Sequence, residues 1–304
     1  MAWLQLTLET GKDHIAELAD LLEVYGAHSV SLSAQSDETL FSEPGANEQP
    51  LWQRTRLSAI LDEDIDLDTL LVCLIHRAGN SAIVNAHIKK IGERDWVQSC
   101  QEAHGPRVYA NRLCVCPSWS SPPANIPHIL TLDPGLVFGT GSHATTSLCL
   151  EWLASQDLRG QRLLDYGCGS GILALSALLL GAEQVYAVDV DSRALMVTRQ
   201  NAEKNGLESR LQILHPGKLG AGKVEVDVLV ANILLNPLIQ LAASFADLVS
   251  PGGQLLLSGL LAQQTGECLG VYRDWFNMQA PVFHDEWAML EGRRIQTKNL
   301  TGKS

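Results

Sequence analysis

The sequence lacks the cysteine pattern of a zinc site or a disulfide scaffold. Its 304 residues include seven cysteines, at positions 73, 100, 114, 116, 149, 168 and 268. They are scattered and odd in number, and no Cys-x-x-Cys pair occurs, whereas metal and disulfide frameworks need paired cysteines at regular spacings. Cys114 and Cys116 have the spacing of one strand face. The sequence therefore indicates no metal site, and its cysteine content fits a reducing cytoplasm.

Basic residues and long apolar runs are also scarce. Lys and Arg number 22 against 34 Asp and Glu, a net charge of −12, which argues against a broad, nonspecific grip on nucleic acid phosphates. This charge leaves room for a basic protein partner, although acidic surfaces more often serve solubility alone. No apolar run is long enough to cross a membrane. The N-terminus has neither a basic region nor a long apolar stretch, so we predict no signal peptide and a cytoplasmic protein.

The chain is long enough for two domains, and its 46% of apolar residues can form a real core. Residues 1–91 show the order βαββαβ of ferredoxin-like folds. We expect strands at 1–10, 28–34, 53–61 and 82–91, with a polar loop before the third strand. One helix is expected over 13–25, and another is capped by Asp66 or Asp68 and runs to Arg77. Residues 92–128 are polar, dotted with aromatic residues and rich in Ser and Pro, which predicts a linker with short strands at 107–116.

Residues 129–304 alternate between strand and helix patterns, which predicts an α/β domain with a doubly wound sheet. Strands are expected at 162–167, 184–190, 210–215, 226–233 and 252–260, and helices at 171–181, 192–205, 236–249 and 262–275. The strands are nearly continuous in apolar residues, as in a parallel sheet covered on both faces. Residues 280–295 are expected to form two strands joined around Glu286, as an antiparallel edge hairpin.

This second domain is organised around the stretch from Leu163 to Ile172, a buried strand followed by a glycine turn and a helix. Gly167, Gly169 and Gly171 let the backbone turn tightly and approach a ligand closely. Such a turn lies at the carboxyl end of a parallel sheet, where open α/β folds bind ligands. The spacing G-x-G-x-G differs from the G-x-G-x-x-G of dinucleotide-binding folds, so taken alone the triplet is also compatible with a plain strand–helix turn.

Two acidic residues near this turn narrow the ligand. Asp165 stands just before it, and a carboxylate there favours a cationic group over a pyrophosphate. S-adenosylmethionine carries an ammonium and a sulfonium, so it is favoured over NAD; the alternative is a structural Asp bonded to turn amides. Asp189 ends the next strand about twenty residues on, where an acid accepts hydrogen bonds from ribose hydroxyls. We assign Asp191 as the cap of the following helix.

Polar residues in two further places can contact a ligand, and Asn232 is expected to face the same crevice as the glycine turn. Asn232 ends the strand at 226–233, and its amide oxygen can accept a bond from a substrate amine or a cofactor amino group; the alternative is a turn-forming Asn. A second glycine-rich stretch, 139–146, opens a helix that runs to Ser155. There, Thr145 and Thr146 can bond a ligand or satisfy helix amides. His143 could accept a proton, but a solvent-exposed loop histidine is the simpler expectation.

Together these motifs resemble class I S-adenosylmethionine-dependent methyltransferases, and more narrowly the bacterial PrmA family. The narrower resemblance covers nearly the whole chain and rests on Asp133-Pro-Gly-Leu-Val-Phe-Gly-Thr-Gly-Ser-His-Ala-Thr-Thr146, Val230-Ala-Asn-Ile233 and Cys116-Pro-Ser-Trp119. It implies a seven-stranded Rossmann-like methyltransferase sheet over 129–304 and a substrate-recognition domain over 1–91. It also implies S-adenosyl-L-methionine as the cofactor, with contacts from Thr146, Gly167, Asp189 and Asn232.

The substrate implied by the resemblance is large-subunit ribosomal protein eleven, methylated at its N-terminal α-amino group and at lysine ε-amino groups. The stretch 99–109 departs from the family's pattern, which has a His-Pro-Met-Arg-Phe-like run there. Two alternatives therefore stand beside this substrate: a methyltransferase for another amine, and a cofactor-binding copy with reduced activity. From its place at a strand end, we expect Asn232 to position the amine, while Asp165, Gly169 and Thr145 complete the predicted cofactor contacts.

Overall fold

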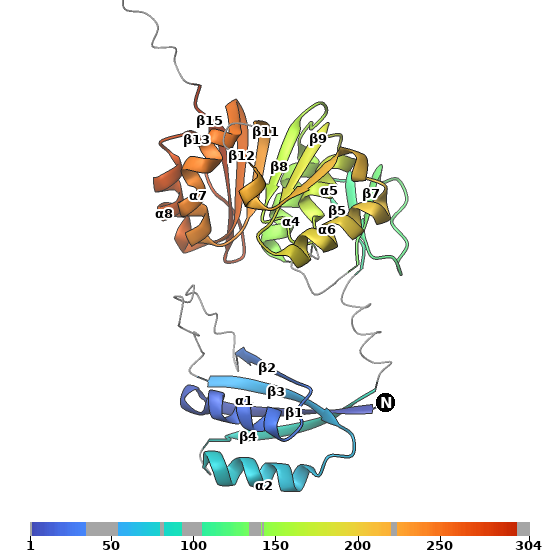
Figure 1. Cartoon of the computed structure of the whole chain (residues 1–304), viewed down its shortest axis with the longest axis vertical. Coiled ribbons are helices and arrows are strands. Elements are labelled where there is room, and N and C mark those ends of the chain that lie inside the picture. The colour runs from blue at the N-terminus through green and yellow to red at the C-terminus, as the bar shows by residue number, and fades with distance from the viewer. Residues whose placement is uncertain are drawn as a thin grey trace, which may run out of the picture. The chain divides into compact units, whose positions relative to one another are not determined.

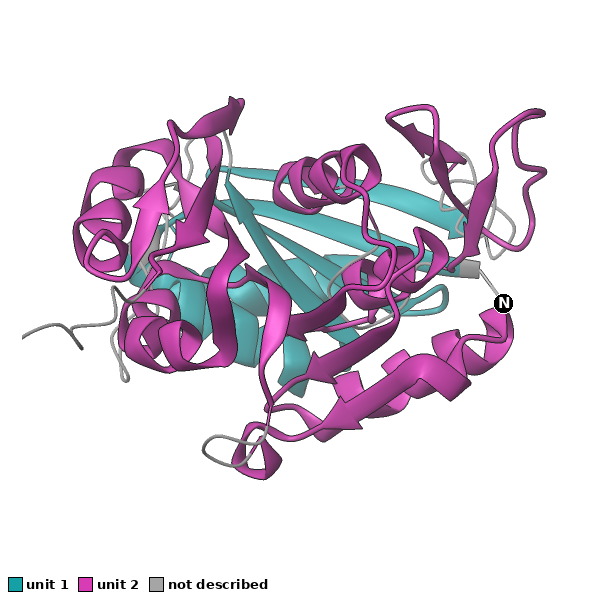
Figure 2. Cartoon of the chain, turned by 90° about the horizontal axis from the view of Figure 1, so that it is seen from above, with its two compact units in different colours: residues 1–103 teal, residues 104–304 magenta. Residues whose placement is uncertain are grey.

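Figure 1 shows the computed structural model of the protein. The structure describes residues 2–34, 54–79, 82–92, 105–133, 141, 143–219 and 224–296. The expected polar loop before the third strand, Cys100, and positions 134–140 and 142 of the second glycine-rich stretch lie outside the described residues. The chain divides into two compact units, residues 1–103 and 104–304, which Figure 2 shows in teal and magenta.

Unit 1 is a four-stranded antiparallel sheet with two helices, in the strand order β2-β3-β1-β4. Its elements are β1 (Ala2–Gly11), η1 (Lys12–His14), α1 (Ile15–Val24), β2 (Ser29–Ala34), β3 (Arg54–Asp62), α2 (Leu67–Ala78) and β4 (Asn85–Gly92). Alternate residues of the central strands, such as Leu6 and Leu57, pack against Leu18 and Leu74 of the two helices. The predicted ferredoxin-like order is confirmed. Of the two predicted caps, Asp66 is the one that accepts from the Thr69 amide.

Unit 2 is built on an eight-stranded sheet. Seven strands follow the order β10-β9-β8-β11-β12-β15-β13, and β14 pairs with β15 beside that path. The first five are parallel neighbours, and β15 runs antiparallel to β12. The bounds are β8 (Arg162–Tyr166), β9 (Gln184–Val188), β10 (Leu211–Leu214), β11 (Val226–Asn232), β12 (Val249–Leu261), β13 (Phe276–Met278), β14 (Val282–His284) and β15 (Trp287–Arg294). The predicted antiparallel hairpin of β14 and β15 is confirmed, but β15 lies between β12 and β13 rather than at the edge of the sheet, and β13 was not predicted.

The sheet of unit 2 is buried on both faces. Leu163 of β8 belongs to a cluster that includes residues of α4 and α5, while its neighbour Leu164 belongs to a second cluster that includes residues of α7 and α8. This is why the strand patterns are continuous in apolar residues rather than alternating. The helices are α4 (Ala144–Ser155), α5 (Ile172–Leu179), α6 (Ser192–Asn205), α7 (Leu235–Leu248) and α8 (Thr265–Tyr272), with short turns η2 (Glu208–Arg210), η3 (Pro216–Lys218) and η4 (Ala262–Gln264).

A small third sheet shows that unit 2 begins earlier in the chain than the predicted residue 129. In this sheet, β6 (Leu113–Cys116) pairs with β5 (Arg107–Tyr109) on one side and with β7 (His128–Thr131) on the other. Tyr109, Leu113 and Leu130 are buried in the cluster that contains α4 and α5. The Arg112 guanidinium donates to the carbonyls of Ala154 at 2.7 Å and Gln156 at 2.9 Å, at the end of α4. Residues 104–128, expected as part of a linker over 92–128, therefore belong to unit 2.

Among the described residues, no helix is long and apolar enough to span a membrane. Within the same part of the chain, no group of three or more His, Cys, Asp or Glu is arranged to hold a metal ion.

Candidate active site

The glycine turn joins β8 to α5, and its conformation requires glycine. Gly167, Gly169 and Gly171 have φ of +78°, +54° and +80°, a region that other residues rarely adopt. A Cβ on Gly167 would lie 2.3 Å from Cγ2 of Ile233, and one on Gly171 would lie 2.8 Å from Cγ2 of Thr198. The triplet is therefore set by the packing of neighbouring elements as well as by room for a ligand.

Asp189, directly after β9, holds this turn in place. Its Oδ2 accepts from the Gly169 amide at 2.9 Å, and its Oδ1 accepts from the Asp191 amide at 2.9 Å. A carboxylate offers about four lone-pair sites, so two remain for a ligand. Asp191 accepts from the Arg193 amide at 2.8 Å and is the N-cap of α6. The division of roles predicted for the two aspartates is confirmed for Asp191, and the ribose contact of Asp189 stays a prediction.

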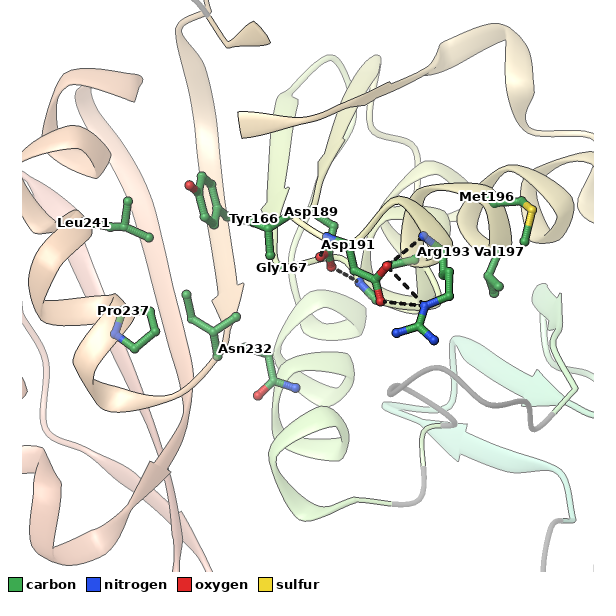
Figure 3. Close-up of a pocket in the computed structure, with 14 residues that line it drawn as sticks. Tyr166, Gly167, Asp189, Asp191, Arg193, Met196, Val197, Asn232, Pro237 and Leu241 are labelled. Carbon is green, nitrogen blue, oxygen red and sulfur yellow. Dashed lines mark hydrogen bonds and ion pairs between the residues drawn. The ribbon is translucent and has the colours of Figure 1, made fainter. Parts of the chain in front are cut away.

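A cavity of about 670 Å³ opens at the carboxyl ends of β8, β9 and β11. This first cavity has the size of sites that hold drug-sized ligands. In Figure 3, Asp189 and Asn232 lie between apolar residues of two helices, with Pro237 and Leu241 of α7 on one side and Met196 of α6 on the other. The full lining is Tyr166, Gly167, Gly169, Asp189, Val190, Asp191, Arg193, Ala194, Met196, Val197, Asn232, Ile233, Pro237 and Leu241.

Asp165 does not line the first cavity. Its side chain is 1% exposed, and its Oδ2 accepts from the Ala174 amide in the first turn of α5 at 3.0 Å. Its Oδ1 is buried and has no hydrogen-bond partner among the described residues. Burial, with a smaller contribution from the nearby charge of Asp189, raises the pKa of Asp165 to about 7. The contact to Ala174 is the structural alternative stated for this residue, and a role opposite a cofactor cation stays a prediction.

Asn232 ends β11 with its amide held at one side only. Its Nδ2 donates at 3.2 Å to the hydroxyl of Thr146, which lies in the first turn of α4. Its Oδ1 is buried and has no hydrogen-bond partner among the described residues. A buried acceptor left unpaired costs free energy until a donor reaches it. The structure thus joins Asn232 to Thr146, a pairing that was not predicted from the sequence, and a ligand donor would satisfy the remaining amide oxygen.

A second cavity of about 250 Å³ adjoins the first, since Asn232 and Ile233 line both. Its other lining residues are His143, Thr145, Leu234, Gly259 and Trp287. Thr145, predicted as a cofactor contact, therefore lies on this second cavity. Sequence reasoning missed Gly259 and Trp287, which come from β12 and β15 and carry no motif.

His143 is not the exposed loop residue that the sequence suggested. It is half-buried and is the N-cap of α4, where its Nδ1 lies 2.7 Å from the Thr145 hydroxyl and accepts from the Thr145 amide at 3.4 Å. Its ring meets that of Trp287 edge to face, with centroids 4.7 Å apart. Burial lowers the pKa of His143, although the charge of Glu286 acts in the opposite direction. As the N-cap of α4, His143 has its imidazole ring at the second cavity.

One face of α6 ties the glycine turn to β7. The Thr198 hydroxyl donates to the Gly169 carbonyl at 3.0 Å, and Asn201 Nδ2 donates to the Ser170 carbonyl at 2.8 Å. Asn205 binds both backbone groups of Thr131, donating to its carbonyl and accepting from its amide at 2.8 Å each. The spacing of three and four residues, typical of one helix face, was the signal in the sequence for this polar stripe.

Comparisons with known proteins match almost the whole chain. The family described as "Ribosomal protein L11 methyltransferase (PrmA)" matches residues 2–295. The chain belongs to this family. It is 42% identical over 294 residues to the ribosomal protein L11 methyltransferase of Shewanella amazonensis, covering 97% of this chain and 99% of that one. It is 43% identical over 295 residues to that of Azotobacter vinelandii, covering 97% and 100%.

A solved structure of ribosomal protein L11 methylase from Lactobacillus delbrueckii subsp. bulgaricus shares the fold. It has a TM-score of 0.57 and 27% identity, and the match covers 63% of this chain and 100% of that one. The predicted family, methyltransferase class and class I fold are confirmed. The family is one of S-adenosylmethionine-dependent methyltransferases, which agrees with the cofactor class predicted from the glycine turn together with Asp165 and the family resemblance.

Proposed function

We propose that this protein transfers methyl groups from S-adenosyl-L-methionine to amino groups of ribosomal protein L11. Membership of the family supports the reaction class and the substrate. The observation that carries the site is the unpaired Oδ1 of Asn232, buried where two cavities meet. A hydrogen-bond acceptor in that place is what a substrate amine requires.

The residues of the first cavity fit the cofactor. Gly167 and Gly169 bring the backbone close to it, Asp189 has lone pairs left for ribose hydroxyls, and apolar side chains such as Met196 suit an adenine ring. When bound, the cofactor supplies a methyl group on a positively charged sulfur. Thr146 acts on this site through Asn232, since it lines neither cavity itself.

The second cavity suits the methyl acceptor. The attacking amine must be neutral, and a lysine with a pKa near ~10.4 needs more help than an α-amino group near ~8. Apolar surroundings such as Ile233, Leu234 and Trp287 lower the pKa of an amine that enters. Asn232 Oδ1 then accepts one N–H, so that the nitrogen lone pair faces the first cavity. After transfer, the Trp287 ring favours a methylated cation.

His143 completes the acceptor side. Burial lowers its pKa and so disfavours a charged ring that would repel an incoming amine, while its Nδ1 stays engaged with Thr145. The remaining contribution is positioning, which can supply several kcal/mol when reacting groups are held in line.

A methyl-transfer assay tests this proposal. Purified enzyme is incubated with methyl-labelled cofactor and unmethylated L11, and the product is analysed by mass spectrometry. We expect whole methyl increments on L11 amino groups. Asn232→Ala should remove transfer, whereas Asn277→Ala, at an exposed residue of β13, should not. Label on RNA, or cofactor binding without label on L11, would overturn the substrate; absence of cofactor binding would overturn the reaction.

A further inference from the structure

Strand β12 carries one extra residue where it passes the second cavity. Leu257 pairs with Leu290 of β15, and Leu260 pairs with Ala288, so three steps on β12 match two on β15. Ser258 and Gly259 therefore form a β-bulge, which we call the Ser258–Gly259 bulge. Bulges redirect side chains and backbone, and they are frequent beside active sites.

Gly259 allows β12 to approach the peptide that follows Asn232. Its φ is +84°, and a Cβ there would lie 2.4 Å from the carbonyl oxygen of Ile233 and 2.8 Å from its carbonyl carbon. These atoms belong to the backbone, so they cannot rotate away as a flexible side chain can. Any other residue at this position would have to push the Ile233 peptide out of place.

Ser258 connects the same bulge to the first turn of α4. Its side chain is fully buried, and its hydroxyl lies 3.4 Å from the Thr145 carbonyl and 3.2 Å from the Ala288 carbonyl. Thr145 precedes Thr146, whose hydroxyl receives the Asn232 amide. The bulge thus contacts the elements on both sides of Asn232, the Ile233 peptide and the start of α4.

We infer that Ser258 and Gly259 are positioning residues for the methyl-accepting amine. They set the separation between the Ile233 peptide and the first turn of α4, and so the width of the second cavity and the aim of Asn232. Gly259 lines the second cavity, and neither residue lines the first. The bulge therefore borders the acceptor cavity directly and reaches the first cavity only through Asn232 and Ile233, so we expect its main effect on the acceptor. This inference rests on the proposed function.

Gly259→Ala tests it through two readouts on the full-length enzyme. Methyl transfer to L11 should fall by about ten- to a hundredfold in kcat/KM, the effect of a misplacement near 1 Å. Calorimetric binding of S-adenosylhomocysteine should stay at the wild-type Kd. Gly206→Ala is the matched control, because Gly206 also has a positive φ, +66°, but a Cβ there would have no atom of the described residues within 4 Å. It should keep kcat/KM while sharing the cost in Tm.

Ser258→Ala is the second variant, and it decides the matter if Gly259→Ala does not fold. It should lower kcat with an unchanged Kd for S-adenosylhomocysteine. Wild-type kcat/KM in a folded Gly259→Ala, or in Ser258→Ala, would overturn the inference. If the Kd for S-adenosylhomocysteine rises by as much as kcat/KM falls, the inference is also overturned, because the bulge would then act on cofactor binding. A wild-type enzyme that leaves L11 unlabelled would overturn the proposed function and this inference together.

Discussion

Replacing Asp189 with alanine is the sharpest test of the first cavity. The carboxylate already accepts from the amides of Gly169 and Asp191, both at 2.9 Å, so it organises the turn before any ligand arrives. Asp189 also lines the first cavity, so a ligand there can reach its carboxylate. The substitution removes a charged acceptor from the ribose, and it also leaves two backbone amides without their partner.

The magnitude follows from these contacts. A hydrogen bond to a charged group contributes about 1.5–3 kcal/mol, which corresponds to a rise of roughly ten- to a hundredfold in the Kd for S-adenosylhomocysteine. Loss of the two amide contacts should also lower Tm in the absence of ligand. Asp191→Ala serves as the matched control, because it removes a carboxylate that caps α6 at a cost of about 1 kcal/mol in stability.

Calorimetry with two ligands separates the ribose contact from the effect on the turn. The wild type should bind S-adenosylhomocysteine more tightly than an analogue that lacks the ribose 2′-hydroxyl. In Asp189→Ala this preference should vanish, while in Asp191→Ala it should persist. If Asp189→Ala weakens both ligands equally and preserves the preference, Asp189 only holds the glycine turn and the ribose assignment is refuted.

Three other substitutions test the surroundings of the turn. Burial raises the pKa of Asp165 to about 7, so between about pH 4 and 7 the folded chain keeps a proton that the unfolded chain releases, and the stability of the wild type falls as pH rises. Asp165→Asn lacks this titration, so its urea stability relative to wild type should increase from pH 5 to pH 8. A difference that stays constant over this range would contradict the prediction. Gly167→Ala should abolish cofactor binding, because the new Cβ would lie 2.3 Å from the Cγ2 methyl of Ile233. Adding Ile233→Ala removes that methyl and should restore part of the binding. If binding is not restored, the loss comes from the strained backbone at position 167 and not from the clash. Asn205→Ala should lower the free energy of unfolding by about 1–3 kcal/mol through its two bonds to Thr131, with Asn205→Asp, which keeps one acceptor, in between.

Local patterns predicted the parts of the fold that local physics determines. The apolar runs of β8 and β11, the glycines after β8 and the Asp191 cap each depend on residues close in sequence. The strand-end position of Asn232 could be predicted because parallel strands present their carboxyl ends at one edge. Its contact with Thr146, 86 residues away in the first turn of α4, was not predicted, because no local pattern joins the two.

The parts that were not predicted depend on distant pairings. Trp287 and Gly259 enter the second cavity because β15 pairs antiparallel with β12, with a bulge between, and neither residue has a local signature. The short strands β5 and β6 were predicted, but their place in unit 2 was not: Leu113 is buried because α4 and α5, distant in sequence, supply the apolar surface. Asp165 was predicted as a cofactor contact from its position alone, whereas its observed bond is to Ala174.

The polar stripe of α6 restricts how the length of this helix can change. Asn201 binds the turn at Ser170, and Asn205, one turn later, binds Thr131 on a different sheet. One residue inserted between them would rotate Asn205 by about 100° and shift it by about 1.5 Å, so that it would lose both bonds. The length and register of α6 therefore fix the distance between the glycine turn and β7, two segments far apart in sequence. An insertion after the exposed Gly206 would keep Asn201 and Asn205 in place, and its cost would fall instead on Leu207, which is buried in the core.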